Sequence, residues 1–471
     1  MRDYSFGNFL QELRLRTGLT QYQLGILVGV SDKAVSKWEN GSSKPKSDIL
    51  YKLGEVLGVS TDELLSCKYH SCENEDIKGV FAIKKQLWNK ALEIMHNRYG
   101  EIVPIEILNR FLSEQTEMQN TDMIVYFDFL SVLVSEAKKC GEHIRVKGGV
   151  GSSFVAYLLG ATEVNPLKPH YYCPDCKTVI FDDSVKSGWD LPYRRCLCTK
   201  PMISGGHGIP FEIYRNDVQN NISLTVSVSP EFFSSAKKCA EKYFKEYKTK
   251  VEDRDERISI ITVTSQWSER RITFFTDDEL ARYKALEQVT ATSFDRLDFN
   301  TEDILREFQN GNTDGVTEFK WTFAKNMLDK TTPSSFNDLI QIVGLSHGTG
   351  VWHNNADKMI EQGLSVGKTI AYRDDVFNYI QKKMISKGLT DTGFAYKVME
   401  DTRRGIYAKN GVPNDIKMQL KSIGAEDWFL DSMGKIKYLF QKAHGVTYVR
   451  SAAILMWYKF YYPTEFNEIM L

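Results

Sequence analysis

Residues 19–41 read LTQYQLGILVGVSDKAVSKWENG, and this stretch predicts two short helices joined by a tight turn at Gly29. Apolar residues recur with helical spacing on both sides of that turn, at Leu24, Leu27 and Val28 and then at Ala34, Val35 and Trp38. Ser31 is a favourable N-cap, and Asn40-Gly41 is a favourable C-terminal stop. We therefore expect the second helix to run from Ser31 through Trp38, with Ala34, Val35 and Trp38 facing inward.

The same pattern resembles the Cro/C1 repressor type of helix-turn-helix domain, and the resemblance spans residues 1–66. It rests on Leu19-Thr20-Gln21-x-x-Leu24, on Gly29-Val30-Ser31 and on Val35-Ser36-x-Trp38-Glu39-x-Gly41. The resemblance implies that the helix beginning at Ser31 enters the major groove of double-stranded DNA. A helical bundle with no role in DNA binding is the alternative.

The resemblance also implies which side chains would contact DNA. The outward side of the second helix would reach base edges and phosphates, and Gln21 would contact phosphate or brace that helix. Basic neighbours would neutralise backbone charge, which makes affinity depend on salt. The predicted set is Gln21, Ser31, Asp32, Lys33, Ser36 and Lys37, with Arg14, Arg16, Lys44 and Lys46 as the basic neighbours. A homodimer is expected, and a monomer tethered by its other domain is the alternative.

The bulk properties are those of an ordinary globular chain. A length of 471 residues favours two to four domains, because one core rarely grows beyond roughly 250–300 residues. The formal net charge of −1 excludes a global basic field, so any nucleic-acid surface must be local. The chain has no run of 18 apolar residues and a charged N-terminus, which predicts a cytoplasmic protein with no membrane association.

The remaining chain divides by its patterning. Residues 67–140 look helical and carry no motif, so they are interpreted as a linker bundle, a dimerisation element or a remnant of an upstream region. Residues 141–275 mix strands, glycines and turns, and helical periodicity dominates residues 276–471. The predicted fold class is multidomain α+β.

Four of the eight cysteines form two close pairs, Cys173-x-x-Cys176 and Cys196-x-Cys198, separated by 19 residues. Two such thiolate pairs can enclose one tetrahedral Zn²⁺, because each pair lies on a turn and the intervening loop brings the turns together. The sequence therefore predicts structural zinc bound by these four residues. Reduced buried thiols and a redox switch are the alternatives.

Two motifs of the second half, LSHGTGVW at 345–352 and KIKYLFQKAH at 435–444, resemble the PolC type of bacterial DNA polymerase III α subunit. The resemblance extends over residues 141–471. It implies a degenerate mixed α/β palm with a zinc-knuckle insert at 141–275 and a mostly α-helical fingers domain at 276–471.

The resemblance further implies contacts to a nucleotide or to a primer-template. A Gly-rich turn, Lys147-Gly148-Gly149-Val150-Gly151-Ser152-Ser153, stands where the family binds nucleotide. The implied phosphate-binding residues are Lys147, Gly148, Ser152 and Ser153, with His347, Arg373, Arg403, Lys435, Lys437, Lys442 and His444 in the fingers region. For each basic residue, a solvated surface charge is the alternative.

The metal-binding aspartates of the family are missing from this chain. Two-metal phosphoryl transfer needs carboxylates that hold two Mg²⁺ ions. The family positions are occupied here by Asn221, Ser223 and Ile272, so catalysis and Mg²⁺ binding are not expected.

These observations predict a sequence-specific DNA-binding protein, of the transcription-regulator class, with a catalytically inactive PolC-like body that senses or mimics replication components. Replication or phage proteins are candidate partners. A DNA polymerase III α-like enzyme active in replication is one alternative. A mobile-element or antiphage protein that interacts with the replication machinery is another.

Overall fold

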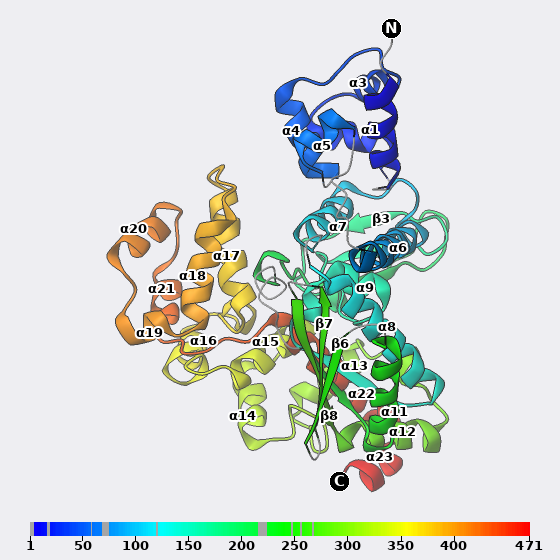
Figure 1. Cartoon of the computed structure of the whole chain (residues 1–471). Helices are drawn as coiled ribbons and strands as arrows, with labels where there is room; N and C mark the ends of the chain where they lie inside the picture. Colours follow the sequence, from blue (N-terminus) through cyan, green and yellow to red (C-terminus); the bar gives the residue numbers. More distant parts are fainter. Residues whose placement is uncertain are drawn as a thin grey trace.

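The structure is a computed structural model, and it describes residues 4–16, 19–57, 59–67, 75–118, 121–214, 224–245, 248–254, 257–265 and 268–471. Figure 1 shows a small helical head at the N-terminus above a larger body, which has a sheet-containing lobe and a helical lobe. The chain is therefore multidomain α+β, in agreement with the sequence-based expectation. No helix in the described ranges combines the length and the apolar character needed to cross a membrane.

The head is all-helical. Ser31 caps the third helix through its hydroxyl, which accepts from the Ala34 amide, and Ser60 and Glu63 form a capping box at the fifth. Leu10, Leu24 and Val35 are fully buried where the helices meet. The helices are α1 (Tyr4–Arg16), α2 (Gln21–Val28), α3 (Asp32–Glu39), α4 (Ser47–Leu57) and α5 (Thr61–Ser66).

Three longer helices follow: α6 (Glu75–Tyr99), α7 (Ile105–Met118) and α8 (Met123–Lys139). Helix α8 is buried along its first half, from Met123 through Leu130. A helix that is buried on all sides belongs to a core. Residues of the head, of these helices and of the following sheet form one continuous hydrophobic cluster.

A five-stranded sheet lies below these helices, in the order β1-β5-β8-β7-β6. Strands β5 and β8 are parallel, and the other neighbours are antiparallel. One face buries Leu224, Val226, Ile272 and Phe274 against α8 and α11 (Pro230–Tyr243). The strands are β1 (Ile144–Lys147), β5 (Leu224–Val228), β6 (Lys248–Arg254), β7 (Arg257–Ser265) and β8 (Ser268–Thr276).

A cysteine-containing module is inserted between β1 and β5. The short elements η1 (Gly148–Ser152) and α9 (Phe154–Leu159) lead into it. It holds a small sheet of order β3-β2-β4, formed by β2 (His170–Tyr172), β3 (Val179–Phe181) and β4 (Ile203–Gly205), and the turn η2 (Gly188–Asp190).

The C-terminal region is helical and has its own hydrophobic cluster. Its long helix α22 (Lys442–Tyr461) contacts α15, η1 and β1, so it joins the helical region to the sheet. The other elements are α12 (Asp278–Thr290), η3 (Phe294–Arg296), α13 (Glu302–Gln309), α14 (Thr322–Thr331), α15 (Phe336–His347), η4 (Trp352–Ala356), α16 (Asp357–Glu361), η5 (Val366–Lys368), α17 (Arg373–Ile385), α18 (Thr392–Arg403), α19 (Ile406–Asn410), α20 (Asn414–Ser422), α21 (Asp427–Met433) and α23 (Pro463–Met470).

Candidate functional site

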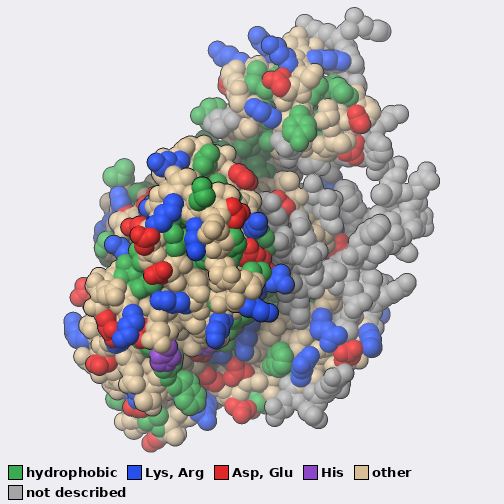
Figure 2. Space-filling view, turned by 90° about the vertical axis from the view of Figure 1, so that its left-hand side faces the viewer, with side chains coloured by type: hydrophobic (Ala, Val, Ile, Leu, Met, Phe, Trp, Pro, Cys, Tyr) green, Lys and Arg blue, Asp and Glu red, His purple; other side chains and the backbone are tan. Residues whose placement is uncertain are grey.

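The predicted recognition helix α3 presents its polar side chains to solvent. Ser31, Asp32, Lys33 and Lys37 are exposed, and Ser36 is half-buried. Val35 and Trp38 are buried, as the helical spacing predicted, and Ala34 is half-buried. In the view of Figure 2, Lys and Arg side chains gather at the outer end of the head. This side of α3 is thus exposed to solvent.

A buried ion pair braces α3 against the rest of the head. Arg14 Nε and Nη2 donate to the Glu39 carboxylate at 2.5 and 2.9 Å, and Arg14 Nη1 donates to the Leu19 carbonyl at 2.7 Å. Gln21 Nε2 donates to the same carboxylate at 2.9 Å. Arg14 is only 7% exposed. The prediction that Arg14 neutralises DNA phosphates is therefore wrong, because its guanidinium is committed to the interior.

The other predicted basic contacts of the head are two exposed lysines and one arginine whose side chain is not described. Lys44 and Lys46 are exposed in the loop before α4. The side chain of Arg16 lies outside the described residues, so its predicted phosphate contact stays a prediction. Gln21, which the sequence offered as either a phosphate contact or a brace, is placed as a brace.

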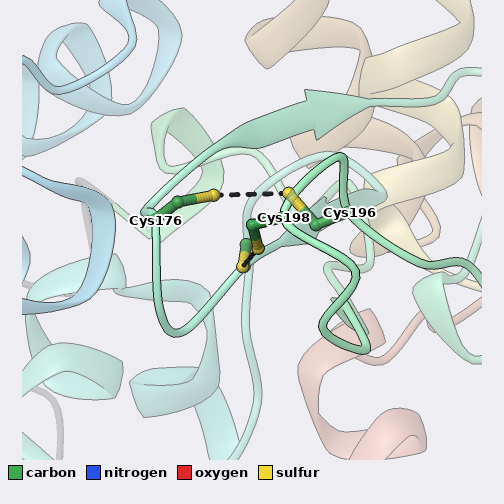
Figure 3. A group of neighbouring side chains, drawn as sticks. Cys176, Cys196 and Cys198 are labelled. Carbon is green, nitrogen blue, oxygen red and sulfur yellow. Dashed lines mark hydrogen bonds between the residues drawn. The ribbon is translucent and has the colours of Figure 1, made fainter.

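The four predicted zinc ligands come together. Their sulfur atoms all lie within 4.8 Å of one another, with Cys173 and Cys198 at 3.5 Å and Cys176 and Cys196 at 3.3 Å. Four sulfurs at a Zn–S distance of about 2.3 Å stand roughly 3.8 Å apart in a tetrahedron. Figure 3 shows the side chains of Cys176 and Cys196 pointing toward one another. The arrangement could hold one metal ion such as zinc.

Two tight turns position these cysteines. The Lys177 amide donates to the Cys173 carbonyl at 3.0 Å, and the Thr199 amide donates to the Cys196 carbonyl at 2.9 Å. Lys177 and Thr199 adopt left-handed backbone conformations, with φ of 64° and 70°. The Thr178 hydroxyl lowers the pKa of the Cys176 thiol to about 6. The shorter Cys-x-Cys spacing is accommodated by a turn that is one residue shorter and also ends in a left-handed residue.

At the end of the Gly-rich turn, the Glu114 carboxylate occupies the position that an anion would take. Helix α9 begins at Phe154, and its Phe154 and Val155 amides donate to the Glu114 carboxylate at 2.8 and 3.1 Å. The Ser153 hydroxyl donates to the same carboxylate at 2.6 Å. Ser152 and Ser153 are fully buried. The prediction that Ser152 and Ser153 bind phosphate is therefore wrong, because both side chains are buried and the Glu114 carboxylate occupies the anion position at Ser153.

Four other predicted phosphate-binding residues, Lys147, Gly148, His347 and His444, meet at the junction of β1, α15 and α22. The Gly148 amide donates to His444 Nδ1 at 3.4 Å. The His444 ring lies 4.4 Å edge-on from the Tyr448 ring, and the His347 ring stacks on Tyr448 at 5.7 Å between centroids. The term cleft denotes these four residues below.

The charges of the cleft are perturbed by burial and by each other. Burial lowers the pKa of His444 to about 4 and lowers the pKa of Lys147, which the Arg145 guanidinium lowers further. His347 Nε2 stands 2.9 Å from the Glu318 carboxylate, and this hydrogen bond raises the pKa of His347. The cleft thus holds one cationic lysine beside a histidine held neutral and a histidine favoured as a cation.

One row of side chains crosses the second face of the sheet and reaches the cleft. The strand register aligns Lys147, Thr225, Thr273, Ser259 and Glu252 across β1, β5, β8, β7 and β6. The Ser259 and Thr273 hydroxyls lie 3.2 Å apart and share a hydrogen bond. This row, called the polar row below, carries three hydroxyl groups between a lysine and a glutamate.

The one acid of the polar row is held by cations. The Glu252 carboxylate lies 3.0 Å from Lys250 Nζ and 3.1 Å from Arg271 Nη1. These neighbours lower the pKa of Glu252. The described side chains of this face thus give no pair of adjacent carboxylates for two divalent ions.

Of the three positions assigned to the family aspartates, only position 272 is described by the structure. Asn221 and Ser223 lie outside the described residues. The assignment of Ile272 is wrong: its side chain is 0% exposed and lies with Leu224 on the face that packs against α11. A carboxylate at position 272 would point into the core. Side chains alternate along a strand, so Arg271 and Thr273 are the neighbours on the polar face.

The remaining predicted contacts are split between buried and exposed residues. Lys442 Nζ donates to the His207 carbonyl at 2.7 Å, and its backbone amide donates to the buried carboxylate of Asp374 at 2.9 Å. Arg373 is 4% exposed, and Arg403 makes two hydrogen bonds to Glu400 at 2.9 and 2.5 Å. The predicted ligand contacts of Lys442 and Arg373 are therefore wrong for this conformation. Lys435 and Lys437 are exposed, and the backbone of Lys437 lies against Gly405.

Three family models match the chain. Residues 10–64 match a helix-turn-helix model, residues 85–222 match the bacterial DNA polymerase III alpha NTPase domain, and residues 279–404 match the bacterial DNA polymerase III alpha subunit finger domain. The chain joins a helix-turn-helix head to a DNA polymerase III α-like body. The resemblance inferred from the motifs is thus confirmed.

Individual relatives agree with the body's assignment. The chain is 29% identical to the DNA polymerase III PolC-type of Thermotoga maritima, over 80% of this chain and 34% of that protein. It is 29% identical to that of Caldanaerobacter subterraneus subsp. tengcongensis, over 81% of this chain and 33% of that protein. For the Staphylococcus aureus protein the values are 28%, 88% and 35%. The chain spans about one third of the length of these relatives.

Sequence reasoning missed several residues that shape the polymerase III α-like body. Glu114 was not identified, because its partners at 153–155 are some 40 residues away and no local motif marks it. Arg145 was also missed, although it is 7% exposed and lies 3.1 Å from Asp277 and 2.9 Å from the Tyr283 hydroxyl. Arg145 stands two residues before Lys147. In a strand, residues two apart lie on the same face, and this spacing was the signal that could have identified Arg145.

Proposed function

We propose that this chain is a sequence-specific DNA-binding protein of the transcription-regulator class, and that its polymerase III α-like body binds ligands without polymerising DNA. The observation that carries this proposal is the polar row. It carries three hydroxyl groups and no pair of adjacent carboxylates among its described side chains, and its one acid is paired with Lys250 and Arg271.

The chemical argument is about charge. Mg²⁺ is a hard cation that prefers carboxylate oxygens, and two such ions must be held about 3.5–4 Å apart to activate a primer 3′ oxygen and clamp a triphosphate. A neutral hydroxyl supplies a lone pair but no negative charge. Asn221 and Ser223 add an amide and a hydroxyl at the sequence positions where the family has aspartates.

The head supports the DNA-binding half of the proposal. Its recognition helix keeps Lys33 and Lys37 exposed, while Arg14, Gln21 and Glu39 fix that helix from behind. A helix held rigidly at its base can present side chains to the major groove at a low entropic cost. We propose binding as a homodimer to a palindromic operator.

The cysteine cluster supports a structural metal. We propose that Cys173, Cys176, Cys196 and Cys198 bind one Zn²⁺ with no open coordination position, as structural sites do. Such an ion stabilises the module and takes no part in chemistry.

The cleft supports a regulatory role for the body. Lys147, Gly148, His347 and His444 would contact a nucleotide or a primed template there, and Lys435 and Lys437 would extend the contact along the helical lobe. Such a ligand changes operator affinity only if it binds the DNA-bound and DNA-free states differently. We thus propose that the protein senses replication components because a ligand bound at the cleft changes the affinity of the head for its operator.

Affinity capture of genomic DNA fragments by the full-length protein tests the first half, followed by footprinting of recovered duplexes. We expect one or a few sequences, with protection that is lost in the variant Lys33→Ala/Lys37→Ala. The matched control is Lys397→Ala, an exposed lysine of α18 in the body. Capture without sequence preference, or an unchanged footprint in the double variant, would reject the proposal.

Operator affinity measured with and without a primed template or a nucleoside triphosphate tests the second half. We expect a change of at least about fivefold. The variant Lys147→Ala should abolish the change and leave ligand-free operator binding intact. An operator affinity that no cleft ligand alters would remove the sensing role.

An active polymerase is the second candidate, because the relatives that match most of this chain are named DNA polymerases. Primer extension with Mg²⁺ or Mn²⁺ decides between the two. Extension that persists in Lys33→Ala/Lys37→Ala and is lost in Lys147→Ala would favour this candidate. We expect no extension.

A further inference from the structure

A cavity of about 320 Å³ lies at the free edge of the sheet, apart from the cleft residues. Strand β1 is the first in the sheet order, so in the described sheet its outer edge pairs with no strand. Helix α8 contributes one wall, and α12 and α22 contribute the opposite wall. We propose that this cavity binds a neutral planar heterocycle of nucleobase or nucleoside size.

The size and the walls of the cavity fit such a ligand. Small-molecule pockets are usually about 300–1,000 Å³ and mostly apolar, with a few polar groups that fix orientation. The apolar lining comes from separate elements, and the lining residues include the aromatic side chains of Trp189 and Phe294. The main apolar residues are Ala137, Ile144, Val146, Leu280, Phe294 and Ile454.

The edge of β1 supplies the hydrogen-bonding pattern. Ile144, Arg145 and Val146 all line the cavity. Alternate residues of an edge strand direct their N–H and C=O groups away from the ladder. A nucleobase presents neighbouring donors and acceptors in one plane, which an extended backbone edge can match.

The charges around the cavity argue against a polyphosphate ligand. Lys138 pairs with Asp295 at 2.8 Å, Arg450 with Glu163 at 2.5 Å, and His143 with Glu287 at 2.8 Å. The Arg145 guanidinium pairs with Asp277 at 3.1 Å. Lys138, Arg450 and Arg145 each already face a carboxylate. A triphosphate would therefore meet repulsion from the lining acids Glu163, Glu287 and Asp295. A neutral ring avoids that repulsion.

The test is isothermal titration of the full-length protein with adenosine, guanosine, cytidine and thymidine. Two further arms use the corresponding 5′-triphosphates and a short single-stranded oligonucleotide. We expect saturable binding of at least one nucleoside, and affinity at least about tenfold weaker for its triphosphate and for the oligonucleotide. Equal or tighter binding of a triphosphate would overturn the neutral-ligand assignment, and no nucleoside binding at millimolar concentration would overturn the site.

Cavity-filling variants locate the binding. Ser451 lines the cavity, and its hydroxyl donates to the Thr447 carbonyl of its own helix, so Ser451→Trp fills space and Ser451→Ala does not. We expect the first to abolish nucleoside binding and the second to keep it. Thr162→Trp fills the cavity from a turn outside α22, in case the helix variant fails to fold. Nucleoside binding that survives in a folded filling variant, or that Lys147→Ala abolishes, would place the ligand elsewhere.

Discussion

The head and the body use their cations in opposite ways. In α3, Lys33 and Lys37 are exposed, and the buried Arg14 of α1 holds that helix in place. In the body, Lys442 donates to the His207 carbonyl, and Arg403 is bound by Glu400. A residue that matches a family motif can therefore be kept for packing alone. Exposure and partners decide which residues remain available to a ligand.

The largest expected effect is loss of the metal that holds the cysteine module. Cys196→Ser removes a thiolate from a cluster whose four sulfurs lie within 4.8 Å. We expect purified wild-type protein to carry about one zinc per chain and the variant none, because a structural site needs its full ligand set. Elemental analysis measures this, with Cys239→Ser on α11 as the control. Equal zinc in Cys196→Ser and wild type would exclude the cluster as the site.

The next effect is on stability, at the anion position of α9. Glu114→Ala leaves the Ser153 hydroxyl and two buried amides without their acceptor, and it leaves Arg110 without its ion pair. Breaking a buried, hydrogen-bonded charge pair is expected to lower the free energy of unfolding by about 3–5 kcal/mol. Denaturant unfolding of the variant checks this. The control is Glu106→Ala, an exposed glutamate of the same helix, and a similar loss there would contradict the assigned role.

The exposed lysines of α3 are expected to have a smaller effect on DNA affinity. Replacing Lys37 with alanine should weaken binding about uniformly across sequences and lower the slope of log affinity against log salt by about 1. Binding measured at several salt concentrations gives this slope. A loss confined to one operator sequence, with the slope unchanged, would show that Lys37 reads a base.

The smallest effect is a pH dependence from the cleft. Glu318 raises the pKa of His347 above its ordinary value of 6.5, so the pair stabilises the fold below pH 6.5. That stabilisation is lost as the pH rises through the raised pKa. Because both side chains are partly exposed, we expect less than about 1 kcal/mol. Unfolding free energies at pH 6 and pH 8 should differ less in His347→Gln than in wild type.

The sequence predicted what depends on local spacing. Ser31 caps α3 as its type and position required, and the two cysteine pairs meet because each lies on its own turn. The sequence did not predict contacts between residues that are distant along the chain. Glu114 fills a turn some 40 residues along the chain, and no local pattern reports it.

The error at Ile272 has a different origin. The position was inferred from the motif alignment, and a shift of one residue along a strand exchanges its two faces. Only the register with Leu224 reveals that position 272 faces the core. An alignment that is accurate to within one residue can therefore place the end of a helix. It cannot decide which face of a sheet a strand residue occupies.

The carboxylate at the start of α9 has a consequence for any attempt to restore phosphate binding. Glu114 is tethered to the turn it occupies, so its effective concentration there does not fall on dilution. A free phosphate would have to displace the Glu114 carboxylate, which is part of the same chain. Displacement would leave the buried amides of Phe154 and Val155 without their acceptor. Substitutions within the turn alone would therefore not reopen it, and the Glu114 carboxylate on α7 would have to be removed first.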